Sequence, residues 1–150
     1  FPDQAIDRVP LIEIIQRIEK DIIALQPDLV YVHHPGDMNS DHQICAQAVF
    51  AALRPMSTRL AYPEIMTYET PSSNDQAPNF GSYSFQPNHY VRVDDVWERK
   101  LEALKAYWDE LQPPPHPRSL LMIEALAHRR GAESWTEKAE AFMLVRRRWD

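Results

Sequence analysis

The sequence has little cysteine, no long apolar run and no excess of basic residues, and each of these features excludes a class of protein. Cys45 is the only cysteine among the 150 residues, so an intrachain disulfide and a cysteine-rich zinc site are both excluded. No apolar run approaches the roughly 20 residues of a membrane span, and no signal-peptide core is visible. Basic residues number 16 against 22 acidic ones, a net charge of -6, which argues against binding to nucleic acid or an anionic membrane. We therefore expect a soluble, cytoplasmic protein.

Glycine is also rare, with 3 residues against 13 prolines, so we expect stiff loops. The remaining composition is that of a packed globule, with 44% hydrophobic and 25% charged residues. We predict a single domain over residues 1–150. The chain opens on Phe1 and enters a helical pattern without a strand before it. We therefore expect the domain to be incomplete at its N-terminus.

The first third of the chain alternates helix and strand patterns. Apolar residues at helical spacing predict a helix from Leu11 to Leu25, which Pro27 ends. The run Leu29–Val32 is apolar on both faces, as expected of an interior parallel strand. After a polar loop, a second helix begins with the capping-box spelling Ser40-x-x-Gln43 and is apolar over most of its circumference. This order is typical of an α/β fold.

The later patterns fit the same fold class. Short strands are predicted over 65–68, 90–93 and 141–145. A helix is predicted to open at Asp95, with Trp97 and Trp108 packing in the core. Ser119 is predicted to cap a further helix, which Gly131 stops. The pattern as a whole predicts an α/β sheet with flanking helices.

Most of the reactive side chains lie in one segment, residues 33–42, between the predicted strand and the second helix. It holds three of the six histidines, together with Asp37, Asn39 and Asp41. In open α/β sheets this junction, at the carboxyl end of a strand, is where ligands bind. The positive end of the helix dipole favours a neutral His42, whose lone pair is then free for a divalent metal. Asp41 or Asp37 could add a second ligand or fix an imidazole. Alternatively, Asn39 and Asp41 are helix caps and turn formers, and the histidines are loop residues.

The same segment resembles a known family. It reads Pro35-x-Asp37-x-Asn39-x-Asp41-His42, which is similar to the second signature of the LmbE-like (PIG-L) de-N-acetylases. Further segments that resemble the family follow in the expected order: Tyr68–Ser73, Phe85–Asn88, Trp97–Lys100, Pro115–Ser119 and Arg130–Phe142. The resemblance covers essentially the whole chain. It implies a Rossmann-like sheet with flanking helices, here with its first strand missing.

The resemblance also implies a chemistry. The family hydrolyses N-acetyl groups of amino sugars or their conjugates with a divalent metal, normally zinc, which polarises the amide carbonyl and acidifies its bound water. By resemblance His42 is one of three metal ligands. A first signature, His-Pro-Asp-Asp, supplies the other two ligands and the general base, and it is absent here. We therefore expect the 150-residue chain by itself to bind metal weakly, to lack deacetylase activity and to self-associate through the sheet edge next to Leu29–Val32.

The resulting site prediction assigns three kinds of role. His42 is the metal ligand. His34 and Asp41 are catalytic residues, although a His34 that merely hydrogen-bonds its own loop is an equal alternative. Substrate-binding roles are predicted for Asp37, Asn39, Glu69 and His116, and the partner is a small N-acetylated sugar or conjugate. The alternative function is a non-catalytic remnant or an accessory carbohydrate-binding module of the same fold.

Overall fold

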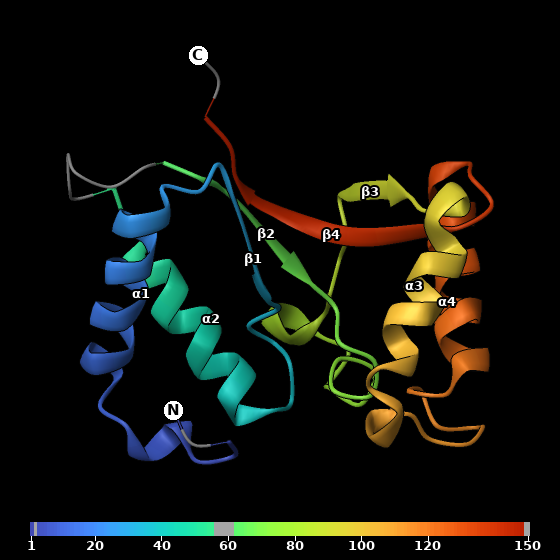
Figure 1. Cartoon of the computed structure of the whole chain (residues 1–150), viewed down its shortest axis with the longest axis horizontal. Coiled ribbons are helices and arrows are strands. Elements are labelled where there is room, and N and C mark those ends of the chain that lie inside the picture. The colour runs from blue at the N-terminus through green and yellow to red at the C-terminus, as the bar shows by residue number, and fades with distance from the viewer. Residues whose placement is uncertain (2, 56–61, 149–150) are drawn as a thin grey trace. The chain divides into compact units, whose positions relative to one another are not determined.

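The computed structural model describes residues 1, 3–55 and 62–148 of the chain. It divides into two compact units, one formed by Phe1–Gln86 with Met143–Asp150 and the other by Pro87–Phe142. Each unit is described by itself below, with elements labelled as in Figure 1. The prediction of one domain over the whole chain stays a prediction. No helix within the described ranges is long and apolar enough to cross a membrane.

The first unit contains two long helices and two whole strands. Its elements, with two short 3-10 turns, are η1 (Ile6–Arg8), α1 (Leu11–Leu25), β1 (Leu29–His33), α2 (Ser40–Ala52), β2 (Glu64–Tyr68) and η2 (Gly81–Tyr83). The bounds of α1 are those that the periodicity predicts. Its C-cap is Gln26, in the left-handed conformation with φ 45°, whose N–H donates to the Ile22 carbonyl. The strands β1 and β2 pair in parallel, so β1, α2 and β2 form a βαβ unit.

Two groups of buried side chains form the core of this unit. Ile14 and Ile15 of α1 pack against Ala48 and Ala52 of α2, and these small alanines let the helices lie close together, side by side in Figure 1. A second cluster packs α2 against the sheet and contains Ile22, Val32, Ala46, Leu53 and Ile65. Only Ser40 and Gln47 of α2 are exposed, so its predicted burial is confirmed.

The second unit is built around one antiparallel strand pair. Its elements are β3 (His89–Arg92), η3 (Asp94–Val96), α3 (Trp97–Lys105), η4 (Trp108–Glu110), α4 (Leu120–Ser134) and the first half of β4 (Ala139–Arg146). His89 lies opposite Phe142, and Arg92 opposite Ala139. The core is a cluster of Val93, Trp97, Ile123 and Ala127. Among the described residues the strand order of the sheet is β1-β2-β4-β3.

The strand order corrects one prediction. Within the described part of the chain β1 is the edge strand of the sheet, where an interior strand was predicted. A sheet edge next to Leu29–Val32 is, however, what the predicted loss of a first strand implies. Its inner residue Val32 is 4% exposed, whereas Leu29 and Tyr31, which point to the opposite face, are 37% and 49% exposed. An apolar run on both faces therefore did not imply burial of both faces. The geometry of the candidate site depends on the parallel pairing of β1 with β2, which is present.

Three details of the helices also differ from the sequence prediction. The N-cap of α2 is Asn39 rather than Ser40. The helix predicted to open at Asp95 begins at Trp97 and ends at Lys105. Trp108 therefore lies outside it, in η4, with 71% exposure instead of in the core. Gly131 lies inside α4, which ends at Ser134. A Cβ on Gly131 would lie 2.4 Å from the Glu137 carbonyl oxygen, so this glycine permits a close backbone approach rather than ending the helix.

Candidate functional site

The candidate site lies in the first unit, where two parallel strands end side by side. His33 is the last residue of β1, and its partner in the register is Tyr68, the last residue of β2. The next amide, His34 N–H, donates to the Tyr68 carbonyl at 3.1 Å, and Met38 N–H donates to the Ser73 carbonyl at 3.2 Å. The loops that follow the two strands are therefore tied together at the carboxyl edge of the sheet, where α/β folds bind ligands.

Gly36 lets the first loop pass close to a second segment of the unit. A Cβ at this position would lie 2.5 Å from Tyr83 Cα and 2.6 Å from the Ser82 carbonyl oxygen. Both neighbours are backbone atoms, so they cannot turn aside as a side chain could. Glycine at position 36 is thus required by this close approach, and it fixes the path of the loop from His34 to Asn39.

Asp37 is the centre of this loop, and its side chain is fully buried (0% exposed). Its Oδ1 accepts a hydrogen bond from Asn39 N–H at 2.8 Å, and its Oδ2 lies 2.9 Å from His42 Nδ1. The backbone oxygen of Asp37 accepts from Gln43 Nε2 at 2.5 Å. A buried carboxylate is tolerated only when it is hydrogen-bonded, and both oxygens of Asp37 are. This burial favours a positioning role for Asp37 over the predicted contact with substrate.

The Asp37 contact sets the proton on the ring of His42. With Oδ2 at 2.9 Å, Nδ1 is the donor, so the proton of a neutral imidazole lies on Nδ1 and the lone pair on Nε2. His42 lies in the first turn of α2, and its side chain is 21% exposed. Metal-binding histidines characteristically have one ring nitrogen held by a carboxylate. The arrangement therefore suits a metal ligand that binds through Nε2.

His34 is buried (3% exposed) and bonds within its own loop. Its Nδ1 accepts a hydrogen bond from Gly36 N–H at 3.1 Å, which places its proton on Nε2. Its ring also meets Phe85 edge to face, with centroids 5.4 Å apart. Burial lowers the pKa of His34, and the negative charge of Asp37 offsets part of this shift. His34 is therefore neutral near pH 7, in the loop-bonded arrangement of the alternative interpretation, and its predicted catalytic role stays a prediction.

His33, to which the sequence analysis gave no role, stacks on His42. The ring centroids are 3.8 Å apart and the planes differ by 12°. The other neighbour is Tyr68, whose ring centroid lies 4.9 Å from that of His33 at a tilt of 51°. Burial and then the nearby His42 lower the pKa of His33, while Asp37 acts in the opposite sense. The doublet of histidines at a strand end was the only sequence signal for this contact.

Asn39 and Asp41 serve the start of α2. Asn39 Oδ1 accepts from Asp41 N–H at 2.9 Å, which is the capping bond that the alternative interpretation predicted. The Asp41 side chain forms its hydrogen bond with a different segment. Its Oδ1 accepts from Ile6 N–H at 3.4 Å, and the residue is 8% exposed. The carboxylate that holds the imidazole of His42 is therefore Asp37 and not Asp41. The catalytic role of Asp41 and the substrate role of Asn39 stay predictions.

The remaining predicted residues lie elsewhere. Glu69 follows β2 directly, in the first unit, and is partly exposed. His116 lies in the second unit, where its Nδ1 accepts from Arg118 N–H at 3.0 Å. Substrate binding by either residue stays a prediction. Cys45 is half-buried on α2, and burial followed by the charge of Asp41 raises the pKa of its thiol, so it stays protonated near pH 7.

The described residues supply one well-oriented metal ligand and no complete ligand set. Catalytic zinc usually takes three protein ligands. Among the residues that the structure describes, no group of three His, Cys, Asp or Glu side chains could hold a metal ion. His42, held by Asp37, could serve as one of the three ligands. The described residues alone do not make a complete metal site.

Comparison with known proteins identifies the fold. No protein-family model and no curated protein matches the sequence. Among solved structures, the conserved protein TT1542 from Thermus thermophilus superposes with a TM-score of 0.75 and 18% identity, over 100% of this chain and 65% of that one. The N,N'-diacetylchitobiose deacetylase from Pyrococcus horikoshii, in complex with an inhibitor, superposes with a TM-score of 0.71 and 17% identity, over 97% of this chain and 55% of that one.

The chain has the α/β fold of these two proteins. Its predicted fold class, a sheet with flanking helices, is confirmed. At this level of identity the likeness extends to the fold and not to the reaction. The chain spans 65% and 55% of the lengths of the two structures. The predicted loss of a first strand and of a first signature stays a prediction.

Proposed function

We propose that this chain forms part of a hydrolase that removes the acetyl group from an N-acetylated amino sugar or its conjugate. The observation that carries the proposal is the pair formed by Asp37 and His42 at the carboxyl edge of a parallel βαβ unit. The fold around this pair is shared with a deacetylase, which supports the reaction class without deciding it.

In this proposal His42 is one ligand of a divalent metal, zinc in the first instance. Asp37 keeps the proton on Nδ1, which leaves Nε2 free to bind. The described residues hold no complete group of metal ligands. The resemblance assigns the other two ligands and the general base to the first signature, which this sequence does not contain. His34 and Asp41 remain the predicted catalytic residues, and Glu69 and His116 remain predicted contacts with the sugar.

Acetate release tests the proposal. The natural polypeptide that contains this chain is assayed with N-acetylglucosamine and with its β-linked dimer, with zinc and after chelation. We expect zinc-dependent release of acetate that His42→Ala abolishes, while His128→Ala, a partly exposed histidine on α4, leaves the rate unchanged. Release that survives both chelation and His42→Ala would contradict the proposal.

The incomplete ligand set favours a second candidate function. A fold that holds one oriented ligand and, among its described residues, no complete metal group could act as a non-catalytic carbohydrate-binding module. This candidate predicts binding of N-acetylated sugars by the same polypeptide without acetate release, with or without zinc. Calorimetric titration with the same two sugars separates the two functions.

A further inference from the structure

The stacked pair of histidines has a geometry that limits what His33 can do. Its ring lies flat against that of His42, with centroids 3.8 Å apart and planes only 12° from parallel. An imidazole nitrogen would bind a metal through its lone pair, at the edge of the ring. His33 presents its face to His42 and not a nitrogen lone pair. His33 therefore cannot share a metal with His42 in this arrangement.

The contact with Asp37 does not by itself fix the ring of His42. One hydrogen bond at Nδ1 sets the direction of a single donor, and the ring can still tilt about the line of that bond. A tilt moves Nε2, which lies on the far side of the ring from Nδ1. An aromatic face packed against the ring removes this freedom, and His33 provides that face.

His33 is itself held in place by its position in the sheet. It is the last residue of β1, paired in register with Tyr68, and the Tyr68 ring packs on it at 4.9 Å. His33 and Tyr68 belong to the strands and His42 belongs to α2, so the stack fixes the helix residue against the sheet. Rigid elements hold a binding group more exactly than loops do.

We propose that His33 is a positioning residue, whose flat face holds the imidazole of His42 so that Nε2 is presented to the metal in one orientation. The proposal rests on the proposed function, because it takes His42 as a metal ligand. The competing explanation is that His33 only fills space at the end of β1. The two differ in what a side chain at position 33 needs: an aromatic face in the first case, and only volume in the second.

A pair of substitutions separates these explanations. His33→Phe keeps an aromatic face, whereas His33→Leu keeps apolar volume without one. His128→Ala, on α4, is the control for changes in histidine content. The first measurement is made without metal: ¹H–¹⁵N NMR of the histidine rings reports which nitrogen of His42 carries the proton and whether its carbon-bound protons feel the ring current of a stacked neighbour. The second is calorimetric titration with Zn²⁺.

We expect His33→Phe and His128→Ala to keep the ring-current shift and the Nδ1 proton of His42, with Zn²⁺ affinity within about 2-fold of wild type. We expect His33→Leu to lose the shift, to mix the two tautomers and to bind Zn²⁺ about 3–10-fold more weakly. The ring-current shift only reports whether a ring is stacked on His42, so the test rests on the other two readouts. Equal tautomer populations of His42 and equal Zn²⁺ affinity in the Leu and Phe variants would overturn the proposal.

The two measurements also separate this proposal from the proposed function. If His42→Ala binds Zn²⁺ as tightly as wild type, His42 is not a ligand and the proposed function fails. The NMR measurement on the metal-free protein still decides in that case whether His33 orients the ring of His42. If His42→Ala loses Zn²⁺ binding but His33→Leu keeps the His42 tautomer and the Zn²⁺ affinity of wild type, only the positioning role fails.

Discussion

Oδ2 of Asp37 lies 2.9 Å from Nδ1 of His42. Asp37 is a loop residue, whereas His42, five positions later, belongs to helix α2. The carboxylate is fully buried and the imidazole is partly exposed. The buried carboxylate of Asp37 accepts a hydrogen bond from Nδ1 of His42. This leaves Nε2, on the more exposed ring, free to bind a ligand. The pair is the one feature of the described residues that points beyond packing to chemistry.

Asp37→Asn should weaken metal binding while keeping the size of the side chain. An amide can present its NH₂ to His42 Nδ1, which moves the ring proton to Nε2 and occupies the nitrogen that binds metal. We expect a loss of about 10–100-fold in Zn²⁺ affinity, measured by titration, and a switch of tautomer by ¹⁵N NMR. Asp109→Asn, on the exposed turn η4, is the control. An unchanged tautomer and affinity in Asp37→Asn would contradict the role assigned to Asp37.

Gly36→Ala should destabilise the site loop. The added methyl would lie within 2.8 Å of three backbone atoms of Ser82 and Tyr83, and backbone atoms cannot give way without moving their segment. We expect a loss of about 2–3 kcal/mol in the free energy of unfolding, measured with urea. Gly81→Ala is the matched comparison, because its Cβ meets nothing within 4 Å and only its φ of 57° is unfavourable. That substitution should cost about 1 kcal/mol. A larger loss for Gly81→Ala than for Gly36→Ala would be inconsistent with the described path of the loop.

The cap of α2 gives a direct test between two neighbouring residues. Asn39 Oδ1 accepts from Asp41 N–H, whereas Ser40 is exposed and is the first helical residue. Asn39→Ala should therefore cost about 1 kcal/mol of stability, and Ser40→Ala only a few tenths. Urea unfolding measures the loss of stability in each variant and shows which of the two residues caps α2. A larger loss of stability for Ser40→Ala than for Asn39→Ala would instead support Ser40 as the N-cap, as the capping-box pattern predicts.

Local patterns predicted most elements of this fold. The periodic isoleucines of α1 gave its bounds, and the apolar runs located β1 and β2. The cap of α2 was missed by one residue, because Asn39 and Ser40 are both good caps and only the backbone conformation distinguishes them. The local pattern predicts a helix end at Gly131, because the close approach of Gly131 to Glu137 is a contact outside the helix that no local pattern records.

The sequence indicated a candidate segment, but only some of the contacts within it. The density of polar residues between β1 and α2 marked the segment, and the resemblance singled out His42. The choice between Asp37 and Asp41 as the partner of His42 depends on how the loop turns at Gly36. The stacking of His33 on His42 depends on the approach of α2 to the end of β1. The edge position of β1 likewise follows from the order of all four strands, which a strand's own residues do not encode.

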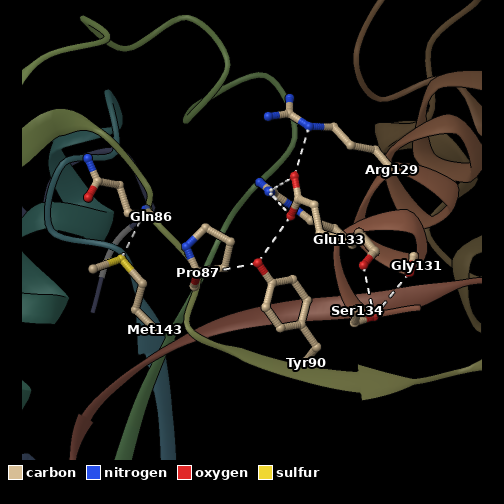
Figure 2. Close-up of polar contacts among 9 residues, drawn as sticks. Gln86, Pro87, Tyr90, Arg129, Gly131, Glu133, Ser134 and Met143 are labelled. Carbon is tan, nitrogen blue, oxygen red and sulfur yellow. Dashed lines mark hydrogen bonds and ion pairs between the residues drawn. The ribbon is translucent and has the colours of Figure 1, made fainter. Parts of the chain in front are cut away.

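The second unit should lose part of its stability in acid through Glu133. Figure 2 shows this carboxylate between Tyr90 and Arg129, and it also pairs with Arg130 at 2.8 Å. Burial alone would raise the pKa of Glu133, but the hydrogen bond and charge of Arg130, with the bonds from Tyr90 and Arg129, lower it below its ordinary 4.5. Folding thus favours the ionised form. Its contribution is complete above the ordinary value and is lost as the pH falls through the lowered folded value.

Glu133→Gln tests this contribution. Near pH 7 the variant should be about 0.5 kcal/mol less stable than wild type, a small effect because the pair is partly exposed and screened by water. The difference should disappear below the folded pKa, where Glu133 is protonated in the wild type too. Urea unfolding between pH 7 and pH 3 gives both curves, with Glu102→Gln as the control, because Glu102 is exposed on α3 and lies beyond its first turn. If the stability difference between wild type and Glu133→Gln grew as the pH fell, the ionised form of Glu133 would not be the one that stabilises the fold.

The central claim is that His42 binds a divalent metal through the nitrogen that Asp37 leaves free. Titration of the chain with Zn²⁺, compared between wild type, His42→Ala and His128→Ala, tests it most directly. We predict weak binding to wild type and to His128→Ala, and binding to His42→Ala that is at least about 10-fold weaker. Equal Zn²⁺ affinity in wild type and His42→Ala would contradict the claim.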